Sequence, residues 1–403
     1  MMNSQSENEA TAARAAARDV LRGRDMLCFS HDWSGDPLSK THLMRLLAKD
    51  NRILWVNSIG YRAPSASKGD LQRAIQKLKA FAKSARKVEE VERNIFVLNP
   101  LAIPAYGVPA MQKVNRQVLR LQVLAAMRRL GFERPINWVF NPAAAVVAGA
   151  LDEDMLVYYC VDEYTAFSGV AAEQLIALER GLMHRADLVI VSADRLLASK
   201  RHENPRTHLV RHGVNYEHFR KALDEKTTVP SAIANLPRPI LGYFGLMADD
   251  WFDVDLMVEV AKRYSHGSIV LLGKVTMDLS KLTALPNVHL LGRKPYEDLP
   301  GYCKGFDVGL LPFPISEVTL NANPLKVREY LAAGLPVVST AIPEVEVLNL
   351  CRIGRDTEGF LREIEGALAK PGPSAELSAT MANESWDAKL DEIRGHVARA
   401  ARS

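Results

Sequence analysis

The stretch NPLKVREYLAAGLPVVST, residues 323–340, carries the most informative local pattern in the chain. Lys326 and Glu329 are three residues apart, so in a helix they share one face. They fall near the first turn, where free backbone N–H groups attract anions. A Gly-Leu-Pro break at 334–336 then ends the helix, and the apolar residues after it are typical of a buried strand. The stretch predicts an anion-binding helix that leads directly into a sheet.

Short apolar runs alternate with helical patterns on both sides of a proline-containing stretch at 236–239. The first series is DMLCFS (25–30), ILWVN (53–57), NIFVLN (94–99), INWVF (136–140), MLVYYC (155–160) and DLVIVS (187–192). The second is ILGYFG (240–245), SIVLLG (268–273), NVHLLG (287–292), DVGLLPF (307–313) and PVVST (336–340). Such runs predict parallel strands that are buried on both faces. We therefore expect two doubly wound α/β domains.

The length of 403 residues suffices for two domains with separate cores. We expect a tail over 1–24, a first domain over 25–225, a second over 238–375 and a C-terminal helix over 376–403. Ligands of open α/β sheets bind beyond the carboxyl ends of the strands. The chemistry is therefore expected in a cleft that both domains face.

Several protein classes lose support from composition. The four cysteines show neither zinc-site nor disulfide spacing, which favours a reducing compartment. The first 24 residues lack the apolar core of a secretory signal, and no apolar run is long enough to span a bilayer. G-x-G, G-x-x-x-x-G-K-[ST] and G-x-S-x-G are all absent. We expect a cytoplasmic protein that is neither a dinucleotide enzyme, a P-loop hydrolase nor a serine hydrolase.

Positive charge is concentrated in one region. Residues 60–135 hold fifteen Lys or Arg against five Asp or Glu, in a chain with a net charge of +4. Within it, 71–88 and 114–132 have apolar residues at helical spacing and basic residues around them. This pattern is typical of helices that bind an anionic membrane surface. A solvated helix packed on its own domain is the alternative, and nucleic acid is not an expected partner.

The segment at 323–340 resembles the donor-site segment of GT-B glycosyltransferases, especially the retaining group 1 or GT4-like family. Other segments resemble the same family: ADLVIVSADRL (186–196), HGVNYEHF (212–219), ILGYFGLM (240–247), NVHLLGRKPYEDLPGYCKGFDVGLLPF (287–313) and NESWDAKLDEI (383–393). The likeness covers roughly residues 186–395. It implies the GT-B fold, in which two Rossmann-like domains face a cleft and a C-terminal helix crosses back to the first domain.

By this resemblance the second domain binds a nucleotide-sugar, with Glu329 on the ribose and Lys326 on the diphosphate. Two departures stand out: Asn321 replaces an acidic residue of the family, and MADDWFDVDL replaces its basic diphosphate motif. The expected donor-binding set is Gly245, Arg293, Lys294, Asn321, Asn323, Lys326 and Glu329. The alternative for Lys326 and Glu329 is an exposed ion pair.

No metal or other cofactor is expected, because GT-B proteins generally need none. Asp253 and Asp255 form an Asp-x-Asp, which holds a metal in the other glycosyltransferase fold. They fall in a predicted helix, however, where residues two apart point to different sides.

Polar residues follow two strands of the first domain. SHDWSGDP follows the first strand and CVDEY the fifth. Asp32 and Asp162 are candidate general bases for an acceptor hydroxyl, and capping of the next helix is the alternative for each. His31, Trp33 and Glu163 are the expected acceptor-side residues.

The resulting expectation is transfer of a sugar from a UDP- or GDP-sugar to a glycan or lipid-linked acceptor. The setting is the synthesis of bacterial surface polysaccharide or glycolipid, with the protein peripheral on the inner face of the cell membrane. Two alternatives remain open: a nucleotide-sugar epimerase of the same fold, and a non-catalytic sugar-binding protein.

Overall fold

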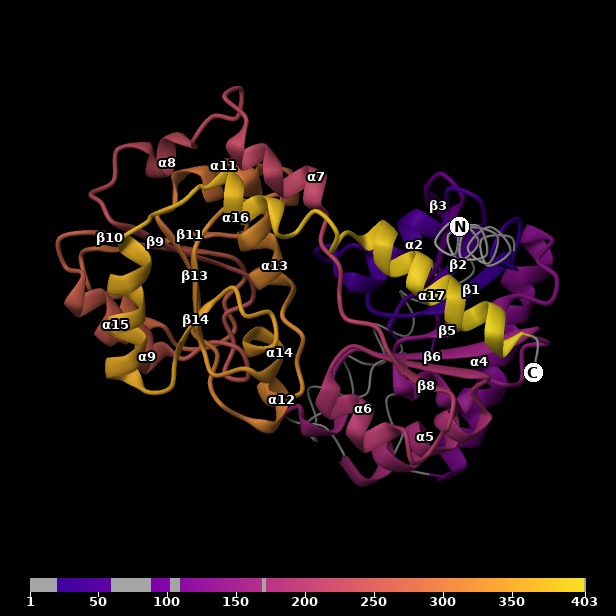
Figure 1. The fold of residues 1–403 in the computed structure, drawn as a ribbon. Coiled ribbons are helices and arrows are strands. Elements are labelled where there is room, and N and C mark those ends of the chain that lie inside the picture. Colours follow the sequence, from indigo (N-terminus) through magenta and orange to yellow (C-terminus); the bar gives the residue numbers. More distant parts are fainter. Residues whose placement is uncertain (1–19, 59–87, 102–108, 169–171, 402–403) are drawn as a thin grey trace, which may run out of the picture. The chain divides into compact units, whose positions relative to one another are not determined.

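The computed structural model describes residues 20–58, 88–101, 109–168 and 172–401. The chain divides into two compact units. Unit 1 comprises residues 1–211 together with 390–403, and unit 2 comprises 212–389. Each unit is a sheet with helices packed on it (Figure 1).

The described residues of unit 1 form an eight-stranded sheet in the order β3-β4-β2-β1-β5-β6-β7-β8. All neighbours are parallel except β3, which pairs antiparallel with β4. The strands are β1 Asp25–Phe29, β2 Arg52–Val56, β3 Val88–Glu92, β4 Ile95–Leu98, β5 Ile136–Val139, β6 Met155–Cys160, β7 Leu188–Val191 and β8 Thr207–Leu209.

Helices cover both faces of this sheet, and β1 shows why its strands are apolar throughout. Met26 and Cys28 pack into one core, whereas Leu27 and Phe29 pack into the other. The helices and 3₁₀ turns are α2 Ser39–Leu47, α4 Pro109–Leu130, η1 Pro142–Val146, η2 Tyr164–Ala166, α5 Ala172–Arg185 and α6 Asp194–Lys200. The C-terminal helix α17, Trp386–Ala400, adds Leu390, Ile393 and Val397 to the core beside Met26. The predicted return of the C-terminal helix to the first domain is therefore confirmed.

Unit 2 contains a six-stranded, wholly parallel sheet in the order β11-β10-β9-β12-β13-β14. The strands are β9 Ile240–Phe244, β10 Ser268–Leu272, β11 Val288–Gly292, β12 Val308–Leu311, β13 Val337–Thr340 and β14 Arg352–Gly354. The helices and 3₁₀ turns are α7 Tyr216–Phe219, η3 Arg220–Leu223, α8 Ser231–Ala234, α9 Val254–Arg263, α10 Ser280–Thr283, η4 Tyr296–Asp298, α11 Leu299–Gly305, α12 Glu317–Leu320, α13 Leu325–Ala332, α14 Pro343–Glu346, α15 Thr357–Leu368 and α16 Ala375–Ala379.

Every apolar run that predicted a strand forms one, but three further strands were missed. Strand β3 has the sequence VEEVE, so its charge obscures it, and it turns back into β4 through Asn94 at a φ of 65°. Strands β8 and β14 contain three residues each, too few for an alternating pattern. All three lie at sheet edges, where strands tolerate charge and brevity.

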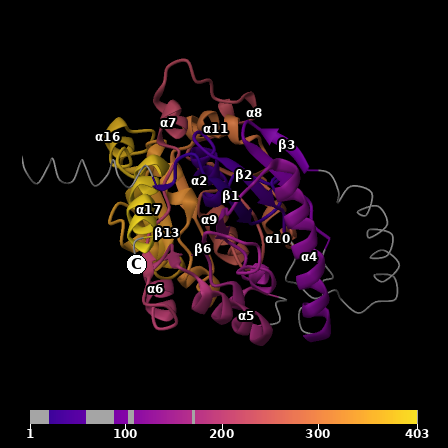
Figure 2. The same ribbon diagram turned by 90° about the vertical axis from the view of Figure 1, so that its right-hand side faces the viewer.

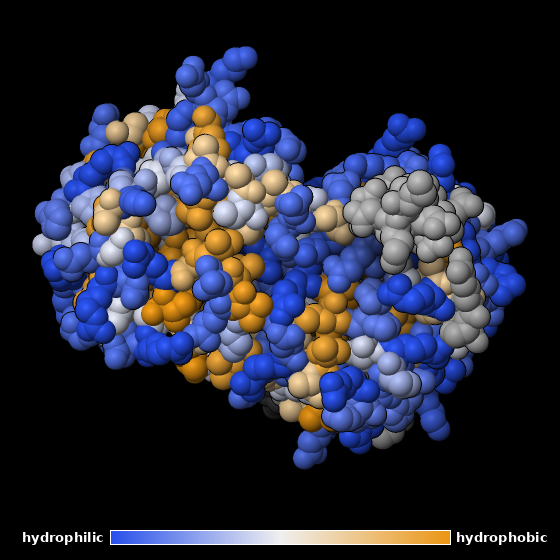
Figure 3. Space-filling model, in the orientation of Figure 1, coloured by the Kyte–Doolittle hydropathy of each residue, from blue (hydrophilic) through white to orange (hydrophobic). Residues whose placement is uncertain are grey.

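Hydropathy and charge describe the surface of the molecule. Figure 3 shows a largely hydrophilic face, with apolar residues gathered over unit 2 near β14 and α14. None of the helices in the described ranges has the length and apolarity that a bilayer crossing requires. Of the two predicted basic helices, 114–132 lies largely within α4, and 71–88 lies almost wholly outside the described residues.

Candidate active site

In unit 2, glycines end the neighbouring strands β9, β10 and β11 at the carboxyl edge of the sheet. Gly245 has a φ of 139° and Gly273 a φ of 135°, conformations that L residues rarely adopt. A Cβ on Gly273 would lie 1.8 Å from the Gly245 carbonyl oxygen. Only glycine therefore allows these two strand ends to meet.

The predicted helix forms as α13, and Lys326 in its first turn lies against Gly245. A Cβ on Gly245 would fall 1.9 Å from Lys326 Cε, so the lysine stem occupies the space that a side chain would fill. The Lys326 ammonium lies 5.8 Å from the Tyr243 ring centroid and 5.6 Å from that of Phe313. The arrangement holds a cation beside bare backbone, at a helix N-terminus where an anion is favoured.

Glu329 lies one turn after Lys326 and is only 8% exposed, so the alternative of an exposed surface ion pair is wrong. Burial raises the pKa of its carboxyl to about 7, even though the Lys326 charge acts in the opposite direction. No described residue donates a hydrogen bond to this carboxylate. Buried polar groups normally find partners, and a ligand hydroxyl pair would supply the missing donors.

Two asparagines of the predicted donor-binding set, Asn321 and Asn323, form hydrogen bonds within unit 2. The Asn321 amide donates to the Glu317 carbonyl at 2.7 Å and so closes α12. Asn323 accepts from Arg328 Nη1 at 2.5 Å, and its backbone carbonyl accepts from His212 Nδ1 at 2.9 Å.

Arg293 and Lys294 directly follow β11, beside the glycine edge. Gly273 donates its N–H to the carbonyl of Gly292, the residue before Arg293, at 2.9 Å. Arg293 is exposed and Lys294 is half-buried. Both residues thus lie at the carboxyl edge of the unit 2 sheet, next to the glycines.

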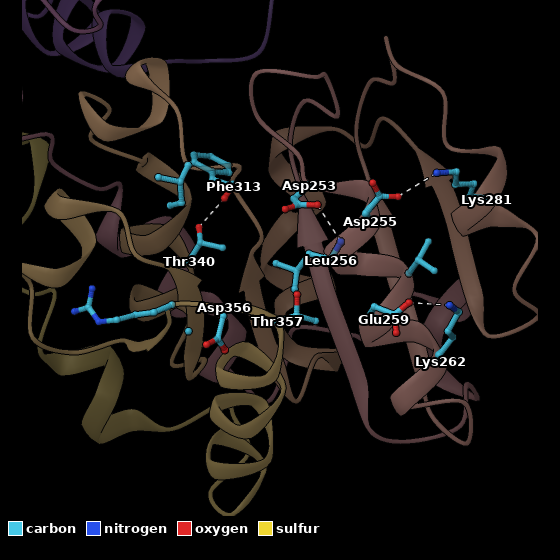
Figure 4. Close-up of a pocket in the computed structure, with 14 residues that line it drawn as sticks. Asp253, Asp255, Leu256, Glu259, Lys262, Lys281, Phe313, Thr340, Asp356 and Thr357 are labelled. Atoms are coloured by element: carbon cyan, nitrogen blue, oxygen red, sulfur yellow. Dashed lines mark hydrogen bonds and ion pairs between the residues drawn. The ribbon is translucent and has the colours of Figure 1, made fainter.

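The Asp-x-Asp residues line another part of unit 2, a pocket of about 580 Å³ at the start of α9 and α15 (Figure 4). Asp253 accepts the Leu256 N–H at 2.9 Å and caps α9, whereas Asp255 pairs with Lys281 at 3.3 Å. The two carboxylates therefore serve different partners. Within the described ranges, no group of three or more His, Cys, Asp or Glu side chains is placed to hold a metal.

In unit 1, the loop after β1 places an aromatic group at the carboxyl edge. Trp55 donates its indole N–H to the His31 carbonyl at 2.9 Å, and the Trp33 ring meets the Trp55 ring edge-on at 4.9 Å. Burial and the Lys40 charge lower the pKa of His31 to about 3, so its imidazole is neutral at pH 7. Asp32 is exposed and accepts the Ser58 N–H at 3.2 Å.

Asp162 follows β6 and is half-buried near Lys40 of α2. Burial raises the pKa of Asp162, and the Lys40 ammonium opposes this rise. Neither Asp162 nor Asp32 caps the following helix, because Leu38 is the N-cap of α2 and Glu163 is the N-cap of η2. Asp162 therefore has the raised pKa and the partly open position that a general base requires.

Glu163 belongs to an ionic group with Lys200 and Glu179 that we call closed, because protein residues supply its ion pairs and hydrogen bonds. Lys200 Nζ lies 2.9 Å from a Glu163 carboxylate oxygen and 2.7 Å from one of Glu179. Tyr158 donates to Glu179 at 2.6 Å, and Thr165 donates to Glu163 at 2.5 Å. Burial alone would raise the pKa of Glu163, but Lys200 and the Thr165 hydrogen bonds lower it overall.

Two buried lysines, Lys40 and Lys200, were not among the residues predicted for the site. The signal for Lys40 is its spacing, because Leu43, Met44 and Leu47 place it on the buried face of α2. Lys200 offered no such signal, since it ends a helix where a basic residue is ordinary.

The chain is similar in sequence and in fold to known glycosyltransferases. Residues 238–380, most of unit 2, match the family model of the glycosyl transferases group 1. A relative in Bacillus subtilis, TuaH, is named as a teichuronic acid biosynthesis glycosyltransferase. It is 25% identical over 264 residues, which span 60% of this chain and 65% of TuaH.

Solved structures match the chain over most of its length. Sucrose-phosphate synthase from Thermosynechococcus elongatus superposes with a TM-score of 0.65 at 17% identity, covering 92% of this chain and 97% of that one. HepE from Anabaena, solved with UDP and glucose, has a TM-score of 0.58 at 14% identity and covers 94% and 99%. The fold, the family model and the relative agree: the chain has the GT-B fold, and its residues 238–380 are a domain of the glycosyl transferases group 1.

Proposed function

We propose that this protein transfers a sugar from a nucleotide-diphosphate sugar, bound by unit 2, to an acceptor bound by unit 1. The observation that carries the proposal is Glu329, a buried carboxylate without a described hydrogen-bond donor, one turn from the cation Lys326. A ribose diol donates two hydrogen bonds to one carboxylate, and a diphosphate suits a lysine at a helix N-terminus.

The chemistry follows from these placements. An acceptor hydroxyl bonds to the anomeric carbon while the bond from that carbon to the diphosphate oxygen breaks. The hydroxyl proton passes to Asp162 or Asp32, and the nucleoside diphosphate leaves. Charge develops on the sugar ring and on the leaving diphosphate. Lys326, assisted by Arg293 and Lys294, stabilises the leaving group, and HepE, solved with UDP, supports a uridine donor.

The acceptor is a lipid-linked glycan in the synthesis of bacterial surface polysaccharide or glycolipid, in line with the pathway named for TuaH. The composition of helix α4 supports binding of the protein to an anionic membrane. It carries five Lys or Arg and no Asp or Glu. Val114, Val118 and Leu121 share its outward face and are 43%, 36% and 60% exposed. Figure 2 shows α4 along the outside of unit 1.

Purified protein incubated with a panel of UDP- and GDP-sugars tests the function. Release of free nucleoside diphosphate only when a lipid-linked acceptor is present supports transfer. Conversion of the donor without acceptor indicates an epimerase, and failure to bind any nucleotide indicates a non-catalytic sugar-binding protein. Either result excludes the proposal.

Sedimentation with anionic vesicles tests the membrane surface. Val118→Asp together with Leu121→Asp should abolish co-sedimentation, because charged groups on the outward face oppose insertion at the interface. Val91→Asp is the matched control, since Val91 is 40% exposed on β3. Undiminished binding of the double variant would exclude α4 as the docking element. Substitution of Lys77, Lys79, Lys83 and Lys87 by Glu, the test of the other basic segment, concerns residues outside the described ranges.

A further inference from the structure

Lys40 and Lys200 are the two buried lysines among the described residues, 8% and 7% exposed. A buried ammonium is costly unless charged or polar partners surround it. Lys200 meets this condition with carboxylates at 2.7 Å and 2.9 Å. These contacts raise the pKa of Lys200, although burial alone would lower it.

Lys40, in contrast, is not surrounded by charged or polar partners among the described residues. Within the described ranges its one hydrogen bond is to the Tyr164 hydroxyl, at a long 3.4 Å, and none of the carboxylates there lies within ion-pair distance. Burial lowers the pKa of Lys40, and the more distant Asp162 only partly offsets this. The ammonium therefore has two N–H donors without an acceptor among the described residues.

The position of Lys40 connects it to the acceptor side. Its charge acts on His31, which follows β1, and on Asp162, which follows β6. Both strands end at the carboxyl edge of the unit 1 sheet, where ligands of such sheets bind. His31 Nε2 lies 3.4 Å from the hydroxyl of Thr41, the residue after Lys40, so the loop after β1 and α2 meet here.

We propose that Lys40 binds an oxyanion of the acceptor, a phosphate or a carboxylate group, close to the hydroxyl that receives the sugar. The inference rests on the proposed function, in which unit 1 holds the acceptor. It narrows the acceptor to an anionic one. The ligand oxygens would supply the acceptors that the buried ammonium lacks, and a charge-assisted pair formed in a water-poor site is strong.

Calorimetry with three small probes tests this directly, after the donor site has been saturated with UDP. Phenyl phosphate and methyl glucuronide carry the two oxyanions, and methyl glucoside is the neutral match. The wild-type chain should bind one charged probe at least about tenfold more tightly than the glucoside. A preference for phenyl phosphate would indicate a phosphate-bearing acceptor, and a preference for methyl glucuronide would indicate a uronic acid.

Variants then locate the binding. Lys40→Met should lose the preference for the charged probe, whereas Lys40→Arg should retain part of it. Lys49→Met removes the same charge from an exposed position just after α2 and should change nothing. In the wild-type chain the preferred probe should also raise the pKa of Lys40, followed by the ¹³Cε resonance that Lys40→Arg removes.

The proposal would be overturned if the wild-type chain showed no preference for a charged probe, or if that preference persisted in Lys40→Met. Equal loss of turnover with charged and neutral acceptors would also overturn it, because Lys40 would then act only through Asp162. UDP affinity, measured in the same samples, separates this failure from failure of the proposed function. A chain that does not bind UDP refutes donor binding, whatever Lys40 does.

Discussion

Each unit contains a buried glutamate beside a lysine, and the two groups differ in how completely their hydrogen bonds are made. In unit 1, Lys200 contacts Glu163 and Glu179 directly, and Tyr158 and Thr165 donate to the same carboxylates. In unit 2, Glu329 lies near Lys326 but receives no hydrogen bond from a described residue.

The pKa values reflect this difference. The contacts of Glu163 lower its pKa, whereas burial raises that of Glu329 to about 7. A closed group stabilises the fold, and an open one is available to a ligand. Charge and burial therefore do not by themselves identify a binding site. A buried charged group that lacks hydrogen-bond partners within the protein does.

The closed group should respond most strongly to mutation. Lys200→Met leaves Glu163 and Glu179 facing each other without a cation, so we expect a loss of about 3–5 kcal/mol in the free energy of unfolding. Urea denaturation measures it. Lys40→Met is the matched control and should cost much less, because none of the carboxylates in the described ranges forms an ion pair with Lys40. Equal losses in the two variants would contradict the distinction between closed and open groups.

The candidate bases come next. Asp162→Asn and Asp32→Asn should each leave donor affinity intact, and one of them should lower turnover by about 100-fold or more. Asp162 is the stronger candidate, because burial raises its pKa. Steady-state kinetics with a saturating donor measures the effect. Near-normal turnover in both variants would show that neither carboxylate is the base.

The strands of both sheets that carry the site were predictable, because they are buried on both faces and therefore continuously apolar. Strand β3 was not, since an edge strand can carry VEEVE without penalty. Lys326 and Glu329 were found through the resemblance and their spacing on α13. The spacing did not reveal that Glu329 is buried, which depends on how α13 packs against β9 and β12.

Lys40 marks the limit of sequence analysis more clearly. On paper it is one of many lysines on amphipathic helices, where long side chains normally reach water. Only the packing of α2 beside His31 and Tyr164 shows that its ammonium stays inside. The sequence gives the residue type but not its contacts, so it could not show that the ammonium of Lys40 has few hydrogen-bond partners among the described residues.

Loss of the open carboxylate should affect binding rather than folding. Glu329→Ala should weaken nucleotide-sugar binding about 10-fold to 150-fold, the equivalent of charge-assisted hydrogen bonds worth about 1.5–3 kcal/mol. The thermal midpoint of this variant should not fall, because the carboxylate that is removed is buried and receives no hydrogen bond from any residue that the structure describes. Glu346→Ala, which loses a pair with Arg355, is the control and should bind donor normally. A dissociation constant within about twofold of wild type would make Glu329 part of the scaffold.

Protonation of Glu329 produces the smallest effect and the most direct test. With a pKa of about 7 in place of 4.5, the folded chain keeps a proton that the unfolded chain releases. The stability contributed by this residue is therefore present below about pH 4.5 and is lost as the pH rises through 7. Donor binding has the opposite trend, because ribose hydroxyls need the ionised form as acceptor.

The deciding measurement is the affinity for an intact UDP-sugar between pH 8 and pH 6, in the wild-type chain and in Glu329→Gln. The diphosphate of an intact donor lacks the terminal phosphate proton that titrates near pH 6. Wild-type affinity should fall about tenfold over this range as Glu329 takes up its proton. Glu329→Gln should bind weakly at every pH, with no such slope. The same fall in both chains would contradict the assignment of Glu329 as the carboxylate that receives the donor.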